Sequence, residues 1–95
     1  SSSSSSSGIG AGKKPRYRTV KAMIDAGVIK SGIDVLHVPH KGMDYLATLT
    51  STGEIIYEKK SFNTLSALSA FVKNRPDNGW TSTLYEGRML SDYRF

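Results

Sequence analysis

Turn sequences divide this chain into short segments. From Thr19 onward, a turn-forming pair that ends in glycine recurs along the chain, at Ser31-Gly32, Lys41-Gly42, Thr52-Gly53, Asn78-Gly79 and Glu86-Gly87. Such pairs interrupt helices and strands because glycine adopts backbone angles that are unfavourable for other residues. The intervals leave room only for short helices and short strands, and the whole chain has 95 residues. We therefore expect one small domain with a modest core.

The composition excludes several classes of protein. The chain has no cysteine, which excludes a disulfide scaffold, a cysteine-ligated zinc site and a thiol nucleophile. No apolar run approaches the roughly 18 residues that a membrane span needs, and the N-terminus lacks the charged start and apolar middle of a signal peptide. We expect an intracellular soluble module that does not contact a membrane.

The first 16 residues differ in composition from the rest. Ser1 to Ser7 is a serine run, and three glycines follow within the next five residues. This composition cannot offset the entropy cost of ordering, so residues 1–16 are predicted to be a disordered linker and residues 17–95 the folded domain. The stretch from Gly8 to Lys14 has glycines and lysines but not the spacing of a phosphate-binding loop, and no strand precedes it.

The net charge of +5 is concentrated near the N-terminus. Residues 1–18 contain no acid and four basic side chains, Lys13, Lys14, Arg16 and Arg18, and so carry +4. Residues 19–95 contain nine basic and eight acidic side chains, which leaves +1. A basic arm of this kind attracts phosphate without reading sequence. A solubilising linker is the alternative interpretation, and both stay open.

Apolar spacing predicts the first half of the fold. Residues at helical spacing follow Thr19, so we expect a short helix with Thr19 as its N-cap and Gly27 after its last turn. Residues 33–38 and 43–49 have strand composition on either side of Lys41-Gly42, which predicts a hairpin. A third strand over residues 54–57 would complete a meander.

The second half is predicted to hold one helix and one strand. Thr64 is the expected N-cap of a helix that ends near Asn74, with Leu65, Leu68, Phe71 and Val72 on its buried side. Residues 80–85 are predicted to form a strand. The fold class is then α+β, with a small antiparallel sheet of about four strands and two helices packed on one face.

Neither a metal site nor a catalytic centre is predicted. His37 and His40 are the two histidines of the chain, and three positions apart on a strand they point to opposite faces of the sheet. No serine, histidine and acid are grouped in the way that nucleophilic catalysis needs. We expect a binding module with no cofactor rather than an enzyme.

Trp80 is the single tryptophan of the chain and follows Asn78-Gly79. Two interpretations are open for it. The indole can anchor the core, as large aromatic side chains do in small domains, or it can border a groove in which a nucleobase stacks. Burial of the ring distinguishes them.

Other basic and aromatic side chains also allow two interpretations. Lys41, Lys59, Lys60 and Arg75 stand in or beside turns, so they either converge on a phosphate backbone or remain separate solvated charges. Tyr45, Tyr57 and Tyr85 lie in predicted strands and are expected to pack on the sheet.

The order of the motifs resembles the RAMA domain, the restriction enzyme and adenine methylase associated domain. The resemblance covers about residues 17–80, through the segments Thr19–Gly32, Lys41-Gly42, Ser51–Ile55, Ser61–Ala67 and Asn78–Trp80. The tail from Tyr85 to Tyr93 is similar to the Tyr-x-Gly-x-x-Leu-x-x-Tyr pattern of eukaryotic members. Leu65 departs from the family pattern, which has proline at the first helical turn.

The resemblance implies a non-catalytic nuclear module that binds DNA, including DNA with N6-methyladenine. It gives Thr64, Ser66, Asn78, Gly79 and Trp80 as family positions, either for DNA contact or for the fold. Together with the basic residues above, Thr64, Ser66, Asn78 and Trp80 form the candidate DNA-binding set. The alternative is a module that binds a nuclear protein partner at a sheet edge or groove. In either case we expect the isolated domain to be monomeric.

Overall fold

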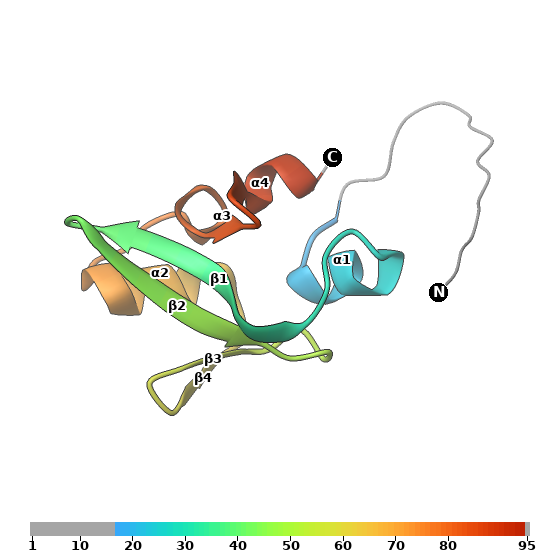
Figure 1. Cartoon of the computed structure of the whole chain (residues 1–95), viewed down its shortest axis with the longest axis horizontal. Helices are drawn as coiled ribbons and strands as arrows, with labels where there is room; N and C mark the ends of the chain where they lie inside the picture. The colour runs from blue at the N-terminus through green and yellow to red at the C-terminus, as the bar shows by residue number, and fades with distance from the viewer. Residues whose placement is uncertain (1–16, 95) are drawn as a thin grey trace.

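The computed structural model describes residues 17–94, which form four helices and a six-stranded antiparallel sheet (Figure 1). The helices are α1 (Val20–Ala26), α2 (Leu65–Lys73), α3 (Gly79–Ser82) and α4 (Leu90–Tyr93). The strands are β1 (Gly32–His40), β2 (Met43–Leu49), β3 (Ile55–Tyr57), β4 (Lys60–Phe62), β5 (Leu84–Tyr85) and β6 (Arg88–Met89). Their order in the sheet is β4-β3-β2-β1-β5-β6. The predicted α+β class is confirmed. Lys13, Lys14 and Arg16, and the predicted linker, lie outside the described residues.

Both predicted helix starts are confirmed by their caps. The Thr19 hydroxyl accepts a hydrogen bond from the Ala22 N–H at 3.4 Å, and the Thr64 hydroxyl accepts one from the Ala67 N–H at 3.3 Å. Each bond satisfies a backbone donor that has no partner within its helix. α1 ends at Gly27, whose φ of 85° is left-handed. Within residues 17–94, no helix combines the length and the apolar character needed to cross a membrane.

Three hairpins share one type of tight turn. Both central residues have positive φ in each of them, at Lys41-Gly42, Glu58-Lys59 and Glu86-Gly87. Two-residue loops of this kind match the twist of the flanking strands. Two of the turns contain the glycine that favours such angles. The Glu58-Lys59 turn contains none, and the strand that follows it, β4, was not predicted.

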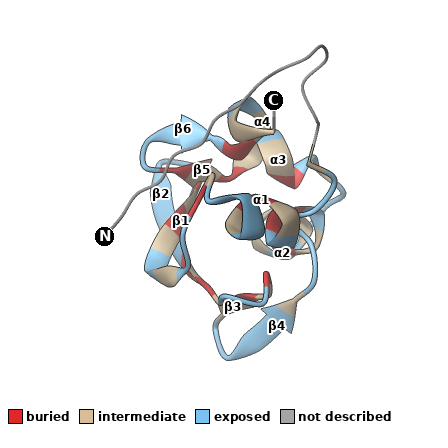
Figure 2. Cartoon of the chain, turned by 90° about the vertical axis from the view of Figure 1, so that its right-hand side faces the viewer, coloured by how far each residue is buried: buried red, intermediate tan, exposed pale blue. Residues whose placement is uncertain are grey.

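The core lies between the sheet and the helices (Figure 2). Alternate residues of β1 and β2 face it, because Leu36 and Val38 are buried and are paired with Ala47 and Tyr45. α2 lies across this face and contributes Leu65 and Leu68, while α1 lies at the end of the sheet where β1 begins (Figure 1). The remaining fully or nearly buried apolar residues are Val20, Met23, Ile29, Leu49, Ile55, Tyr85 and Leu90.

Three expectations are corrected by the structure. The sheet has six strands rather than about four, because β4 and β6 pair at its two edges. Residues 80–82 belong to α3 rather than to a strand, since the Asn78 side chain accepts a hydrogen bond from the Trp80 N–H and caps a helical turn. Phe71 is not on the buried side of α2: it is 40% exposed, because β3 and β4 reach only one side of its ring.

The two ends of the described chain are joined. The Tyr17 N–H donates to the Arg94 carbonyl at 3.3 Å, and the Arg94 Nε donates to the Tyr17 carbonyl at 3.3 Å. The C-terminal segment is held further by Tyr93, whose hydroxyl donates to the Tyr85 carbonyl. Tyr85 in turn accepts a hydrogen bond from the Lys30 N–H. The tyrosines of the tail motif therefore fix the last helix to the fold.

Candidate functional site

Five aromatic side chains form a continuous series that we call the aromatic row: His40, Tyr45, Tyr57, Phe71 and Phe62. Successive ring centroids in the row are 6.5, 6.3, 6.0 and 5.4 Å apart. Four of these side chains are half-buried and Phe71 is exposed. The row therefore presents ring surface to solvent along one side of the domain.

Strand register explains why these rings meet. Tyr45 and Tyr57 are each two residues away from a core residue of the same strand, Ala47 and Ile55, so their side chains point to the helix side of the sheet. Phe62 is paired with Ile55 and shares that face. Phe71 approaches from α2 and contacts both Tyr57 and Phe62.

Basic side chains stand at both ends of the aromatic row. Lys60 is paired with Tyr57 across the β3–β4 hairpin, and its Nζ lies 5.6 Å from the centroid of the Phe71 ring. Lys41 and Arg75 line a groove at the other end, beside His40 and Tyr45. We call the aromatic row together with Lys41, Lys60 and Arg75 the aromatic-basic face.

The groove lies between the tip of the β1–β2 hairpin and the C-terminal end of α2, which Figure 1 shows at the same end of the molecule. Its volume is about 480 Å³, and its lining residues are His40, Lys41, Tyr45, Val72, Lys73, Asn74 and Arg75. Among the described residues, Lys41 and Arg75 take part in no salt bridge. Their charges are therefore available to an anionic ligand.

Lys73 differs from the other two groove cations because Asp77 neutralises it. The Asp77 carboxylate accepts hydrogen bonds from Ser82, from Lys73 at 2.9 Å and from Ser69 at 3.2 Å. The Ser82 bond, followed by the Lys73 bond, holds the pKa of Asp77 far below its usual range. This cluster joins α2 to α3 and fixes the segment that carries Arg75.

The Asn78-Gly79-Trp80 motif has a structural role in this fold. Asn78 caps α3, and Gly79 lies so close to α2 that a Cβ there would be 2.1 Å from the Leu65 carbonyl oxygen. The Trp80 ring is half-buried against the core, and the Arg94 guanidinium carbon covers it at 4.4 Å from the ring centroid. Trp80 thus packs as a core-anchoring residue, and it is not part of the aromatic row.

The structure brings some members of the predicted set together and separates others. Lys41 and Arg75 share the groove, and Lys60 lies at the opposite end of the aromatic row. Lys59 is exposed in the β3–β4 turn and Ser66 is exposed on α2, whereas Arg18 precedes α1. The Thr64 hydroxyl and the Asn78 side chain accept capping hydrogen bonds.

The sequence did not indicate that four members of the aromatic row belong to a candidate binding surface: His40, Tyr45, Tyr57 and Phe71. The alternation of Tyr45 and Tyr57 with apolar residues placed them correctly on the sheet. That pattern does not indicate that the covering helix stops short of the hairpin tip. The two histidines do point to opposite faces, because the residue paired with His37 is Leu46, on the face away from α2. Within the described part of the chain, no three potential metal ligands are clustered.

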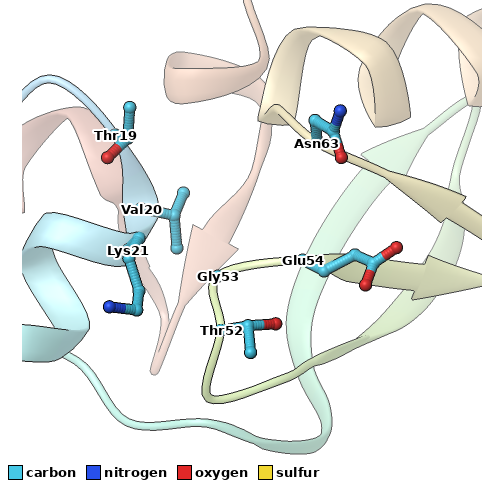
Figure 3. Close-up of a pocket in the computed structure, with 7 residues that line it drawn as sticks. All are labelled: Thr19, Val20, Lys21, Thr52, Gly53, Glu54 and Asn63. Carbon is cyan, nitrogen blue, oxygen red and sulfur yellow. The ribbon is translucent and has the colours of Figure 1, made fainter.

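A second hollow, of about 380 Å³, lies between the start of α1, the β2–β3 loop and Asn63 (Figure 3). Gly53 packs against α1 there, since a Cβ on it would be 2.8 Å from the Lys21 Cβ. Figure 3 shows the Lys21 ammonium and the Glu54 carboxylate pointing away from one another. None of the described residues that line this hollow is aromatic, so the groove at the hairpin tip is the better candidate for a flat ligand.

A family model described as RAMA, Restriction Enzyme Adenine Methylase Associated, matches residues 1–95, the whole chain. The chain therefore belongs to the RAMA family, and the resemblance found in its motifs is confirmed. Comparison with curated proteins found no match.

Proposed function

We propose that this RAMA domain is a non-catalytic nuclear module that binds DNA through its aromatic-basic face. The observation that supports this most is the position of cations at both ends of a row of solvent-accessible rings, since these cations form no salt bridge within residues 17–94. The family description supports the non-catalytic part, because it names association with restriction enzymes and adenine methylases.

The two kinds of side chain contribute differently to the proposed binding. Lys41, Lys60 and Arg75 contact phosphates, which positions the domain and makes the affinity depend on salt. The aromatic rings contact exposed base surface, where stacking is worth about 1–3 kcal/mol per base. The basic residues before Tyr17 add attraction that does not depend on DNA sequence.

Recognition of N6-methyladenine is part of the proposal. The methyl group adds one apolar carbon, and burying it against an aromatic ring is worth about 0.8 kcal/mol. A tenfold preference needs about 1.4 kcal/mol. The expected preference for methylated DNA is therefore less than tenfold.

The nuclear location rests on the tail from Tyr85 to Tyr93, whose sequence is similar to the tail pattern of eukaryotic members of the family. In the structure these two tyrosines are in contact, with ring centroids 5.5 Å apart. Imaging the full-length parent protein in cells, with and without this domain, tests the location.

The DNA proposal is tested by fluorescence anisotropy with matched duplexes that differ only in one N6-methyladenine. We expect binding to both duplexes, strong salt dependence, and a methylated-to-plain affinity ratio between one and ten. Equal affinity at all salt concentrations would remove the methyladenine part and keep the DNA part. Absence of binding at low salt would contradict the whole proposal.

A protein-interaction module is the second candidate, and the face of the sheet away from α2 favours it. Leu46 and Met89 are 38% and 41% exposed on that face, and both belong to a row of paired residues that passes through His37 and Leu84. Ile33, in the part of β1 where the register with β2 shifts, is 79% exposed. A titration with DNA monitored by NMR discriminates: shifts on this face with none at the aromatic row would favour the second candidate.

A further inference from the structure

The tip of the β1–β2 hairpin extends its helix-side face past the end of α2. His40 is paired with Met43, so both side chains lie on the face that Val38 and Tyr45 share. The helix ends at Lys73, and Met43 is 57% exposed. The end of the sheet therefore leaves ring surface uncovered, and this surface is one wall of the groove.

The groove has the size and the chemistry of a site for one small charged aromatic molecule. Its volume of about 480 Å³ falls in the range of ligand pockets. Its walls combine two aromatic rings, His40 and Tyr45, tilted by 48° to one another, with the aliphatic side chain of Val72. Two cations with no salt bridge among the described residues, Lys41 and Arg75, stand at its rim.

The third cation of the groove, Lys73, is not available to an anion. Lys73 is held by Asp77 and Ser82 at 2.9 Å each, so its ammonium is fixed and neutralised. It therefore leaves the binding of an anion to Lys41 and Arg75. Asn74, which ends α2 with a φ of 60°, carries an amide group that can both donate to and accept from a base edge.

We propose that this groove binds a single unpaired nucleotide, with its base against His40 and Tyr45 and its phosphate between Lys41 and Arg75. The inference rests on the proposed DNA-binding function and specifies where one base is taken up. Inside a perfect duplex both faces of a base are already stacked, so that base has to leave the helix before it can enter. A base that is already extrahelical needs no such step, and the domain should prefer it.

The test uses the full 95-residue chain and three fluorescein-labelled DNAs: a perfect duplex, the same duplex with one bulged adenine, and the corresponding single strand. We expect the bulged duplex to bind about tenfold more tightly than the perfect one, in line with the worth of one stacked base. Equal affinity for the bulged and perfect duplexes would overturn the inference and leave DNA binding standing. Failure to bind any of the three DNAs would contradict the proposed function itself.

Two histidine variants locate the effect. In His40→Ala the preference for the bulged duplex should fall to less than twofold. His37→Ala is the matched control, because it removes the same ring from the opposite face of the same strand. It should keep the preference. Equal loss of preference in both variants, each folded by circular dichroism, would place the nucleotide elsewhere.

Tyr45→Leu gives a second measurement at the other ring. Leucine keeps apolar bulk in the sheet and removes the flat surface on which a base can stack. The preference for the bulged duplex should fall here as well. An undiminished preference in both His40→Ala and Tyr45→Leu would overturn the placement of the base in this groove.

Discussion

Gly79 in α3 lies directly against the backbone of Leu65 at the start of α2. A Cβ built on Gly79 would stand 2.1 Å from the carbonyl carbon and oxygen of Leu65 and 2.6 Å from the Ser66 nitrogen. All three are backbone atoms, so none belongs to a flexible side chain that could move aside. The contact explains why a glycine stands between the capping Asn78 and the half-buried Trp80.

Replacing Gly79 by alanine should strongly destabilise the domain. Helices α2 and α3 would have to separate, and we expect a loss of about 1–3 kcal/mol or more in the free energy of unfolding. Urea denaturation followed by tryptophan fluorescence measures it. Gly42→Ala is the control, because no atom lies within 4 Å of its added Cβ and only its φ of 72° opposes the change. A smaller loss in Gly79→Ala than in Gly42→Ala would contradict the close contact.

Asp77 should make stability depend on acid pH. The hydrogen bonds from Ser82 and Lys73 lower its pKa in the folded state, so its contribution is complete above the unfolded value of about 4. That contribution is lost as the pH falls from there toward the lowered folded pKa. Asp77→Asn should lower the urea midpoint at pH 7 and flatten its decrease between pH 5 and 3, relative to the parent.

Asp92→Asn is the control for this prediction. Asp92 faces Arg88 at 3.9 Å with both side chains more than half exposed, and such pairs contribute little to stability. Its urea midpoint should stay near that of the parent at pH 7. If the two asparagine variants lost stability equally, the Asp77 cluster would not have the role assigned to it.

Lys60 and Arg75 should each contribute about one phosphate contact to DNA binding. Changing either to glutamine should weaken binding to every duplex by a similar factor and reduce the slope of log affinity against log salt by about 1. Anisotropy titrations at four salt concentrations give this slope. Arg88→Gln is the control, because Arg88 lies in β6, at the opposite edge of the sheet from β4, which carries Lys60. A slope unchanged by both Lys60→Gln and Arg75→Gln would exclude the aromatic-basic face as the contact surface.

Trp80 and Phe71 should separate stability from binding. Trp80→Phe removes part of a half-buried ring and its contact with Arg94, for which we expect a loss of about 1 kcal/mol or more in stability. Its DNA affinity should stay within twofold of the parent. Phe71→Leu changes an exposed ring, so it should reduce stability less than Trp80→Phe does and reduce DNA affinity more. The opposite result would return the binding site to Trp80, as one of the two sequence-based interpretations holds.

Much of the fold follows from local signals. Thr19 and Thr64 cap the helices as predicted, and the Lys41-Gly42 pair sets the long hairpin. Strand β4 could not be predicted in the same way, because the Glu58-Lys59 turn contains neither glycine nor asparagine and is fixed by pairing with β3. Residues 80–82 have strand composition, and the Asn78 cap with the Gly79 contact overrides it.

The candidate site was less accessible from the sequence, because it depends on distances between elements. His40 and Arg75 are far apart along the chain and meet because α2 stops opposite the hairpin tip. The neutralisation of Lys73 depends on Asp77, which lies beyond the end of its helix. By contrast, the structure gives the two tyrosines of the tail motif a simple role, because the Tyr93 hydroxyl donates a hydrogen bond to the Tyr85 carbonyl.

The mutual hydrogen bonds between Tyr17 and Arg94 hold the two ends of the described chain together, away from the proposed binding surface. Both ends of the described chain meet toward one end of the domain, and the tip of the β1–β2 hairpin lies at the other, as Figure 1 shows. The groove is lined by residues of that tip and of the end of α2. A neighbouring domain joined at either end would therefore be attached at the same small area of the surface. The surface that we expect to meet DNA would then stay clear of whatever the domain is attached to.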